Sequence, residues 1–154
     1  MILHGLAKAG RHLPWPSEEL QRLALVALQR PLDPRRPLQA AQLLEAFVRL
    51  RHDADAVLSA QVFGACQAAL PRWDAAALTA LCGALGRSRR AARAPLEAWE
   101  QRGENGWGRL ARRCAEVIPE ASAWQLASLA HYLGRVGAPK EELEPFYDAL
   151  EAGS

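Results

Sequence analysis

Residues 124–137 read WQLASLAHYLGRVG, a leucine- and alanine-rich stretch whose apolar residues recur at helical spacing. Three earlier stretches repeat this pattern: ILHGLAKAG at 2–10, AQLLEAFVRLRH at 41–52 and AALTALCGALGR at 76–87. Spacings of 44, 35 and 48 residues separate the last leucines of the four copies, which are Leu6, Leu50, Leu85 and Leu133. Such periods, with room for a second helix in each interval, are typical of stacked helical hairpins. The sequence therefore predicts an all-α fold, an α-solenoid of about four stacked hairpins.

The chain of 154 residues is long enough for one domain. We expect a single helical repeat domain with approximate repeats at 1–31, 38–71, 73–118 and 121–152. Because Met1 leads directly into the first pattern, either the first repeat is truncated or the numbering begins inside a longer precursor.

Local signals set the expected helix ends within these repeats. Asp74 stands where an N-cap belongs, and Pro71 should end the helix before it. Gly86 is expected to stop the next helix, since glycine favours helix C-termini. The segment GENGWG, residues 103–108, is expected to be a loop or break, because three glycines interrupt the helical pattern.

Composition excludes several classes of protein. Half of the residues are apolar, but no apolar run approaches the ~18–20 residues of a membrane span. Three cysteines, Cys66, Cys82 and Cys114, lie among apolar residues without C-x-x-C pairing, so we expect buried free thiols in a reducing compartment. The four histidines also lack ligand spacing, so no metal and no cofactor is expected.

The clearest stretch, residues 109–150, resembles the organellar helical-repeat superfamily that includes octotricopeptide, heptatricopeptide and FAST-kinase-like repeats. In that pattern a helix ends in a proline-acidic turn, and a Leu/Ala/Trp helix ending in Leu-Gly and a proline-led helix follow. Here Ile118-Pro119-Glu120, Trp124–Gly134 and Pro139 take those places. The resemblance implies a mitochondrial or plastid protein acting in RNA processing, stability, translation or ribosome assembly. The RAP module found in many relatives is absent, which argues against a nuclease-like activity.

Arginine is concentrated in one part of the chain. Residues 87–113 hold eight arginines against three glutamates, a local net charge of +5, whereas residues 139–154 have a net charge of −4. Clustered arginine is the electrostatic footprint of nucleic-acid binding, because its planar guanidinium matches phosphate oxygens. The candidate RNA-binding residues are these arginines and one tryptophan: Arg87, Arg89, Arg90, Arg93, Arg102, Trp107, Arg109, Arg112 and Arg113.

Tryptophan offers a stacking surface for unpaired bases. We expect Trp73 and Trp124, at the beginnings of repeat helices, to pack against the preceding hairpin. Trp107, between two glycines in the basic segment, is the better candidate for contact with a base or a partner protein, although burial under the loop is an equal alternative.

No local motif indicates a catalytic site: GENGWG lacks the glycine spacing and the Gly-Lys-Ser/Thr of a phosphate loop. We therefore expect no enzyme and no small-molecule substrate, but an RNA-binding subunit of an organellar ribonucleoprotein such as a mitochondrial ribosome. Its expected partners are organellar RNA and other subunits of the assembly, in the mitochondrion or alternatively the plastid.

The alternative is a scaffold subunit of a respiratory or photosynthetic membrane complex that contacts no RNA. Exposed arginines beside Trp107 would favour RNA. Arginines paired with acidic neighbours would favour the scaffold; those neighbours are Glu97, Glu100, Glu104 and Glu116.

Overall fold

The structure, a computed structural model, describes residues 36–49, 55–88, 91–93 and 106–153. Within these ranges the chain is helical or in short connections, and no strand occurs there. The all-α fold class expected from the sequence is therefore confirmed for this part of the chain. The first copy of the repeat, and with it the expected repeat 1–31, lies outside the described residues.

The described helices are α3 (Pro37–Arg49), α4 (Asp55–Ala68), α5 (Ala75–Arg87), α7 (Gly106–Glu116), α8 (Ala123–Leu133) and α9 (Lys140–Ala152). Two short 3-10 helices, η1 (Leu70–Arg72) and η2 (Ile118–Glu120), follow α4 and α7. Each contains a proline in its first turn, Pro71 or Pro119, which cannot donate the next helical hydrogen bond. The prediction that Pro71 stands beyond the end of its helix is confirmed.

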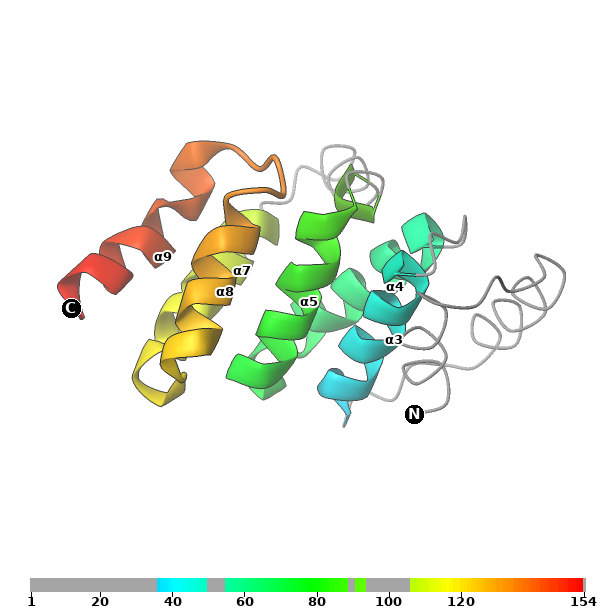
Figure 1. The fold of residues 1–154 in the computed structure, drawn as a ribbon, viewed down its shortest axis with the longest axis horizontal. Coiled ribbons are helices and arrows are strands. Elements are labelled where there is room, and N and C mark those ends of the chain that lie inside the picture. Colours follow the sequence, from blue (N-terminus) through cyan, green and yellow to red (C-terminus); the bar gives the residue numbers. More distant parts are fainter. Residues whose placement is uncertain (1–35, 50–54, 89–90, 94–105, 154) are drawn as a thin grey trace, which may run out of the picture.

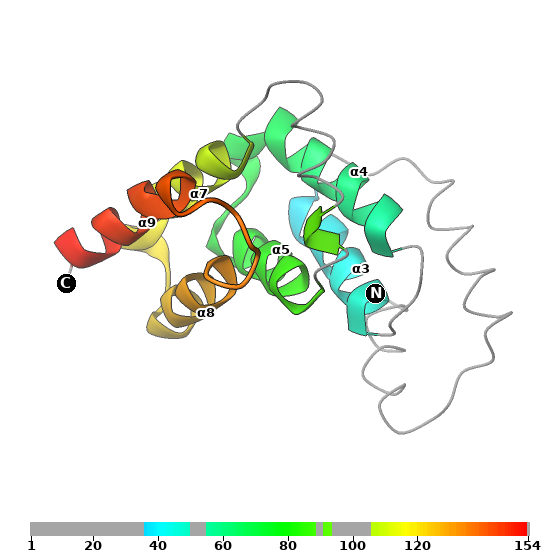
Figure 2. The same cartoon turned by 90° about the horizontal axis from the view of Figure 1, so that it is seen from above.

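The helices form two layers (Figures 1 and 2). In one layer α5 packs between α3 and α8, and in the other α7 packs against α9. Helix α4 lies in the second layer with α7, and it also contacts α3 of the first layer (Figure 2). Of the six α-helices given above, each one in the first layer is thus followed by one in the second.

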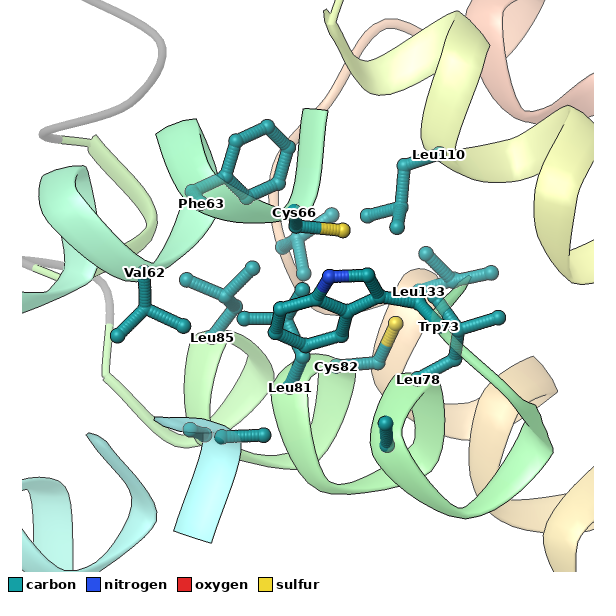
Figure 3. Close-up of a cluster of buried hydrophobic side chains, with 14 of the residues drawn as sticks. Val62, Phe63, Cys66, Trp73, Leu78, Leu81, Cys82, Leu85, Leu110 and Leu133 are labelled. Atoms are coloured by element: carbon teal, nitrogen blue, oxygen red, sulfur yellow. The ribbon is translucent and has the colours of Figure 1, made fainter. Parts of the chain in front are cut away.

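The core lies between the layers and contains the largest apolar side chains. Figure 3 shows the Trp73 indole at its centre, flanked by the thiols of Cys66 and Cys82. Leu78, Leu81 and Leu85 of α5, which recur at helical spacing, are all fully buried. The buried aromatic residues are Phe47, Phe63, Trp73, Trp107 and Phe146. Burial of such side chains, at ~25 cal/mol per Å², is the main force that holds the two layers together.

Side-chain caps fix where two helices begin. The Asp74 carboxylate accepts a hydrogen bond from the Ala77 backbone N–H at 2.9 Å, which confirms the expected N-cap of α5. At α8, Ser122 and Gln125 form a reciprocal capping box, with donor–acceptor distances of 3.2 and 2.9 Å. Caps of this kind stabilise a helix by ~1 kcal/mol.

The structure corrects one expected break and part of another. Gly86 does not end α5, which continues to Arg87; instead Gly86 is buried where the Tyr132 ring of α8 packs on it. Of the expected loop 103–108, residues 106–108 open helix α7 and all three are buried, whereas 103–105 lie outside the described residues. The Gly106 carbonyl accepts a hydrogen bond from Gln67 Nε2 at 3.0 Å, which links the start of α7 to α4.

Candidate functional site

Helix α7 has an apolar inner face and a charged outer face. Its inner residues, Trp107, Leu110, Ala111 and Cys114, are buried in the core. The outer residues Arg109, Arg112, Arg113 and Glu116 recur at spacings of three, one and three, which places them on one side of the helix. Together with Leu70 and Pro71 of η1, they line an open hollow of about 250 Å³.

Arg113 fastens η1 to α7. Its Nε donates a hydrogen bond to the Trp73 carbonyl oxygen at 3.1 Å, and its Nη2 donates to the Pro71 carbonyl oxygen at 3.1 Å. Its Nη1 donates to Glu116 Oε2 at 3.0 Å. The guanidinium therefore satisfies carbonyl groups that the turn after α4 leaves without helical partners.

Arg109 makes fewer hydrogen bonds within the protein than Arg113 does. Its Nη2 donates one hydrogen bond, at 3.1 Å, to the carbonyl oxygen of Gln67 in the last turn of α4. A guanidinium carries five N–H donors, and this side chain is otherwise on the exposed face of α7. Arg109 can therefore hold α4 and still present donors to the hollow.

Arg112 lies between these two on the surface. It is exposed, lines the hollow, and makes no hydrogen bond or ion pair with the described residues. Glu116 pairs with Arg113 at i,i+3 and not with Arg112 at i,i+4. The outer face of α7 thus carries three guanidinium groups against one carboxylate, and that carboxylate is bound to Arg113 rather than to Arg112.

Arg87 belongs to a different surface. At the end of α5, its Nη1 donates to Glu45 Oε1 of α3 at 2.9 Å, and its Nη2 donates to the Tyr132 hydroxyl of α8 at 2.9 Å. Its guanidinium carbon also lies 5.2 Å from the centroid of the Tyr132 ring. Arg87 therefore bridges the first layer of helices and does not join the α7 face.

Only part of the predicted arginine cluster is therefore assembled at one place. Arg109, Arg112 and Arg113 are brought together, while Arg93 is exposed on the short segment 91–93. Arg89, Arg90 and Arg102 lie outside the described residues, as do the acidic residues Glu97, Glu100 and Glu104.

The tryptophans differ from expectation. Trp107 is 1% exposed and packs edge-on against Phe63, with ring centroids 5.2 Å apart, so its indole cannot stack on a base beside the arginines. The alternative that it is buried is the correct one, because α7 turns this residue into the core. Trp73 is buried as expected, but Trp124 is 71% exposed, and the expectation that it packs against the preceding hairpin is wrong. No local signal separates these two residues, since each stands near the start of a helix after a proline-containing turn.

The three cysteines are free and buried, as expected. Burial raises the pKa of the Cys66 thiol, and a hydrogen bond to Cys82, together with burial, raises the pKa of Cys114. These thiols are held protonated and unreactive. In the described part of the chain, no group of three or more His, Cys, Asp or Glu side chains is placed to hold a metal ion.

Comparison of the chain with models of protein families, with curated proteins and with solved structures gives no significant match. Among the described helices, none combines the length and the apolar character needed to cross a lipid bilayer.

Proposed function

We propose that this protein is a non-catalytic α-solenoid of about four helical hairpins that binds RNA in an organellar ribonucleoprotein, such as a mitochondrial ribosome. The observation that supports RNA binding most is the outer face of α7, where Arg109, Arg112 and Arg113 line one hollow. The resemblance of residues 109–150 to organellar helical repeats supports the setting, with the mitochondrion as the compartment and the plastid as the alternative.

The two-layer arrangement of the helices supports the proposal of stacked helical hairpins. The pairs α3 and α4, α5 and α7, and α8 and α9 each place one helix in the first layer and one in the second. A stack of such pairs offers an extended surface rather than an enclosed reaction site. The first hairpin of the proposed four, residues 1–31, rests on the sequence pattern alone.

The chemistry of the α7 face suits a phosphate. Arg112 has no partner among the described residues, and Arg109 retains N–H donors beyond its hydrogen bond to Gln67. Each of the two guanidinium groups that flank the hollow can donate hydrogen bonds to a phosphate oxygen. The excess positive charge of this face also attracts a polyanion at long range. Such contacts position an RNA without reading its sequence.

The test is a titration of a fluorescein-labelled, mixed-sequence single-stranded RNA with the purified chain at several salt concentrations, followed by anisotropy. Arg112→Gln should weaken binding and reduce the slope of log K against log salt by ~0.7, the value for one phosphate contact to a single strand. The matched control is Arg135→Gln, which removes an exposed arginine from the segment after α8.

Two results would overturn the proposal. One is an affinity that Arg112→Gln and Arg135→Gln lower equally, since this would reflect net charge rather than a contact at α7. The other is the absence of any salt-dependent binding.

A second candidate is the scaffold subunit of a respiratory or photosynthetic membrane complex. Two arginines of the cluster favour it, because Arg87 and Arg113 form hydrogen bonds with other groups of the protein itself. In that case the chain binds no RNA, and Arg112→Gln leaves its behaviour unchanged in the same titration.

A further inference from the structure

Within the described part of the chain, helix α8 is less enclosed than helix α5. Helix α5, packed between α3 and α8, buries ten of its residues, whereas α8 buries only Leu129 and Leu133. Helix α9 contacts α8 at Ala130, where the Tyr147 hydroxyl is bonded, but Trp124 is 71% exposed and Ala127 is exposed.

The positions of α8 that match the α8-binding side of α5 are partly occupied by α9. When Leu85 is aligned with Leu133, Gly86 of α5 corresponds to Gly134 of α8. Gly86 is where the Tyr132 ring meets α5, and a Cβ built on Gly134 would lie 3.4 Å from the Tyr147 hydroxyl of α9. The exposed residues that α8 leaves for a partner therefore include Trp124 and Ala127.

Helix α9, at the same end of the molecule as α8, is acidic (Figure 1). It packs mainly against α7. Its Tyr147 hydroxyl donates to the Ala130 carbonyl oxygen of α8 at 2.8 Å, and a Cβ built on Gly153 would lie 3.8 Å from Ile118 Cγ2 of η2. Helix α9 holds five carboxylates against the single cation of Lys140, a net charge of −4. The exposed ones include Glu144 and Asp148, and Glu120 of η2 is exposed as well.

We infer that the end of the molecule formed by α8 and α9 is a docking surface for a basic amphipathic helix of a partner protein. The apolar side of that helix would cover Trp124 and Ala127 of α8, and its lysines or arginines would meet the exposed carboxylates of α9. The exposed Trp124 indole also suits an arginine of the partner, through cation–π contact. An anchoring tryptophan is the residue type that contributes most to such interfaces.

The charge of this end decides between possible occupants. Two copies of the chain joined symmetrically here would set a net charge of −4 against another −4, and an RNA strand would meet the same repulsion. A basic protein helix meets attraction instead. This surface is distinct from the α7 face, so the inference holds whether or not α7 binds RNA.

The test is site-specific photocrosslinking in native extract with the full chain. p-Benzoylphenylalanine replaces Trp124 in one variant and Gln61, an exposed residue of α4, in the matched control. The expected result is an adduct, formed at position 124 and not at 61, that mass spectrometry maps to a helical segment of positive net charge. A Glu144→Lys, Asp148→Lys background should lower the adduct yield by about tenfold, since charge reversal at an interface rim removes the complementarity.

Other results would overturn the inference: no adduct at position 124, an adduct with RNA or with a second copy of the chain, an adduct with a neutral or acidic segment, or a yield that the charge reversal does not change. Because all four substituted positions are exposed, each variant should keep the thermal midpoint of the parent chain, and circular dichroism checks this before crosslinking.

Discussion

The Tyr132 ring of α8 lies so close to Gly86 of α5 that a Cβ added to Gly86 would stand 2.9 Å from Cδ1 of the ring. The same Cβ would also come within 3.0 Å of the Tyr132 carbonyl oxygen, which belongs to the backbone and cannot turn away. Close approach of α5 and α8 therefore depends on the missing side chain. The relation also places the Tyr132 hydroxyl within reach of Arg87, which bonds it at 2.9 Å.

Gly86→Ala should destabilise the protein, although alanine is the better helix former. The helix-propensity gain of up to ~1 kcal/mol is outweighed by forced separation of two packed helices, and we expect a net loss of about 1–2 kcal/mol in the free energy of unfolding. Urea denaturation measures it. Gly64→Ala is the matched control: no atom lies within 4 Å of its added Cβ, so it should stabilise α4 by about 0.5–1 kcal/mol. Equal effects of the two substitutions would refute the packing argument.

Arg113→Gln should destabilise the protein more than Arg112→Gln does. The first removes hydrogen bonds to the exposed carbonyl oxygen of Pro71 and the partly buried one of Trp73, at a cost of about 1–2 kcal/mol. The second removes an exposed side chain with no described partner, and its effect should stay within ~0.5 kcal/mol. Thermal denaturation of both variants tests the difference, and an equal loss would show that the η1 contacts contribute nothing to stability.

Glu45 forms ion pairs with two arginines, so the contributions of these arginines to stability depend on each other. Its Oε1 accepts from Arg49 Nη2 at 2.7 Å and from Arg87 Nη1 at 2.9 Å. We expect a double-mutant cycle of Glu45→Gln with Arg87→Met to give a coupling free energy of about 0.5 kcal/mol, small because Arg87 is partly exposed. The coupling should shrink at high salt. Additive losses would mean that the observed ion pair does not contribute to stability.

The features that the sequence predicted correctly are encoded locally. Asp74 caps the helix that starts at the next residue, and Leu78, Leu81 and Leu85 lie on its buried face because their spacing follows the helical period. The all-α fold class follows from many such signals along the chain. None of them requires knowledge of which elements become neighbours.

The features that the sequence missed depend on residues far apart in the chain. Arg113 reaches carbonyl groups 40 and 42 residues away, and Arg87 reaches Tyr132 across 45 residues. Trp73 and Trp124 have similar local surroundings, yet the first is enclosed by both layers while the second is exposed on α8. The candidate site was therefore predicted only as an arginine-rich region, and its division into bound and available arginines required the three-dimensional contacts.

The cysteines should be unreactive in the folded protein. Burial raises the thiol pKa of Cys66, and that of Cys114 is raised by its hydrogen bond to Cys82 and by burial, so little thiolate exists near neutral pH. In a thiol assay with a disulfide reagent, the three cysteines should react quickly only after denaturant unfolds the chain. Rapid reaction of even one equivalent in the native protein would contradict the enclosed core around Trp73.

Stability at alkaline pH should depend on Tyr147. Burial, and secondarily Cys82, raises the pKa of its hydroxyl above the ordinary value of 10.0. Because the pKa of Tyr147 is higher in the folded state than in the unfolded state, its hydroxyl contributes fully to stability below the unfolded-state pKa. This contribution is lost as pH rises through the folded-state pKa.

Tyr147→Phe should cost about 1 kcal/mol near neutral pH, through loss of the hydrogen bond to the Ala130 carbonyl oxygen. The difference in thermal midpoint between the wild type and this variant should then narrow above a pH of about 10, since only the wild type has a phenol to ionise at position 147. Other tyrosines, lysines and thiols titrate in both proteins and cancel in that difference, so a gap that stays constant across the alkaline range would show that the Tyr147 hydroxyl does not link α8 to α9.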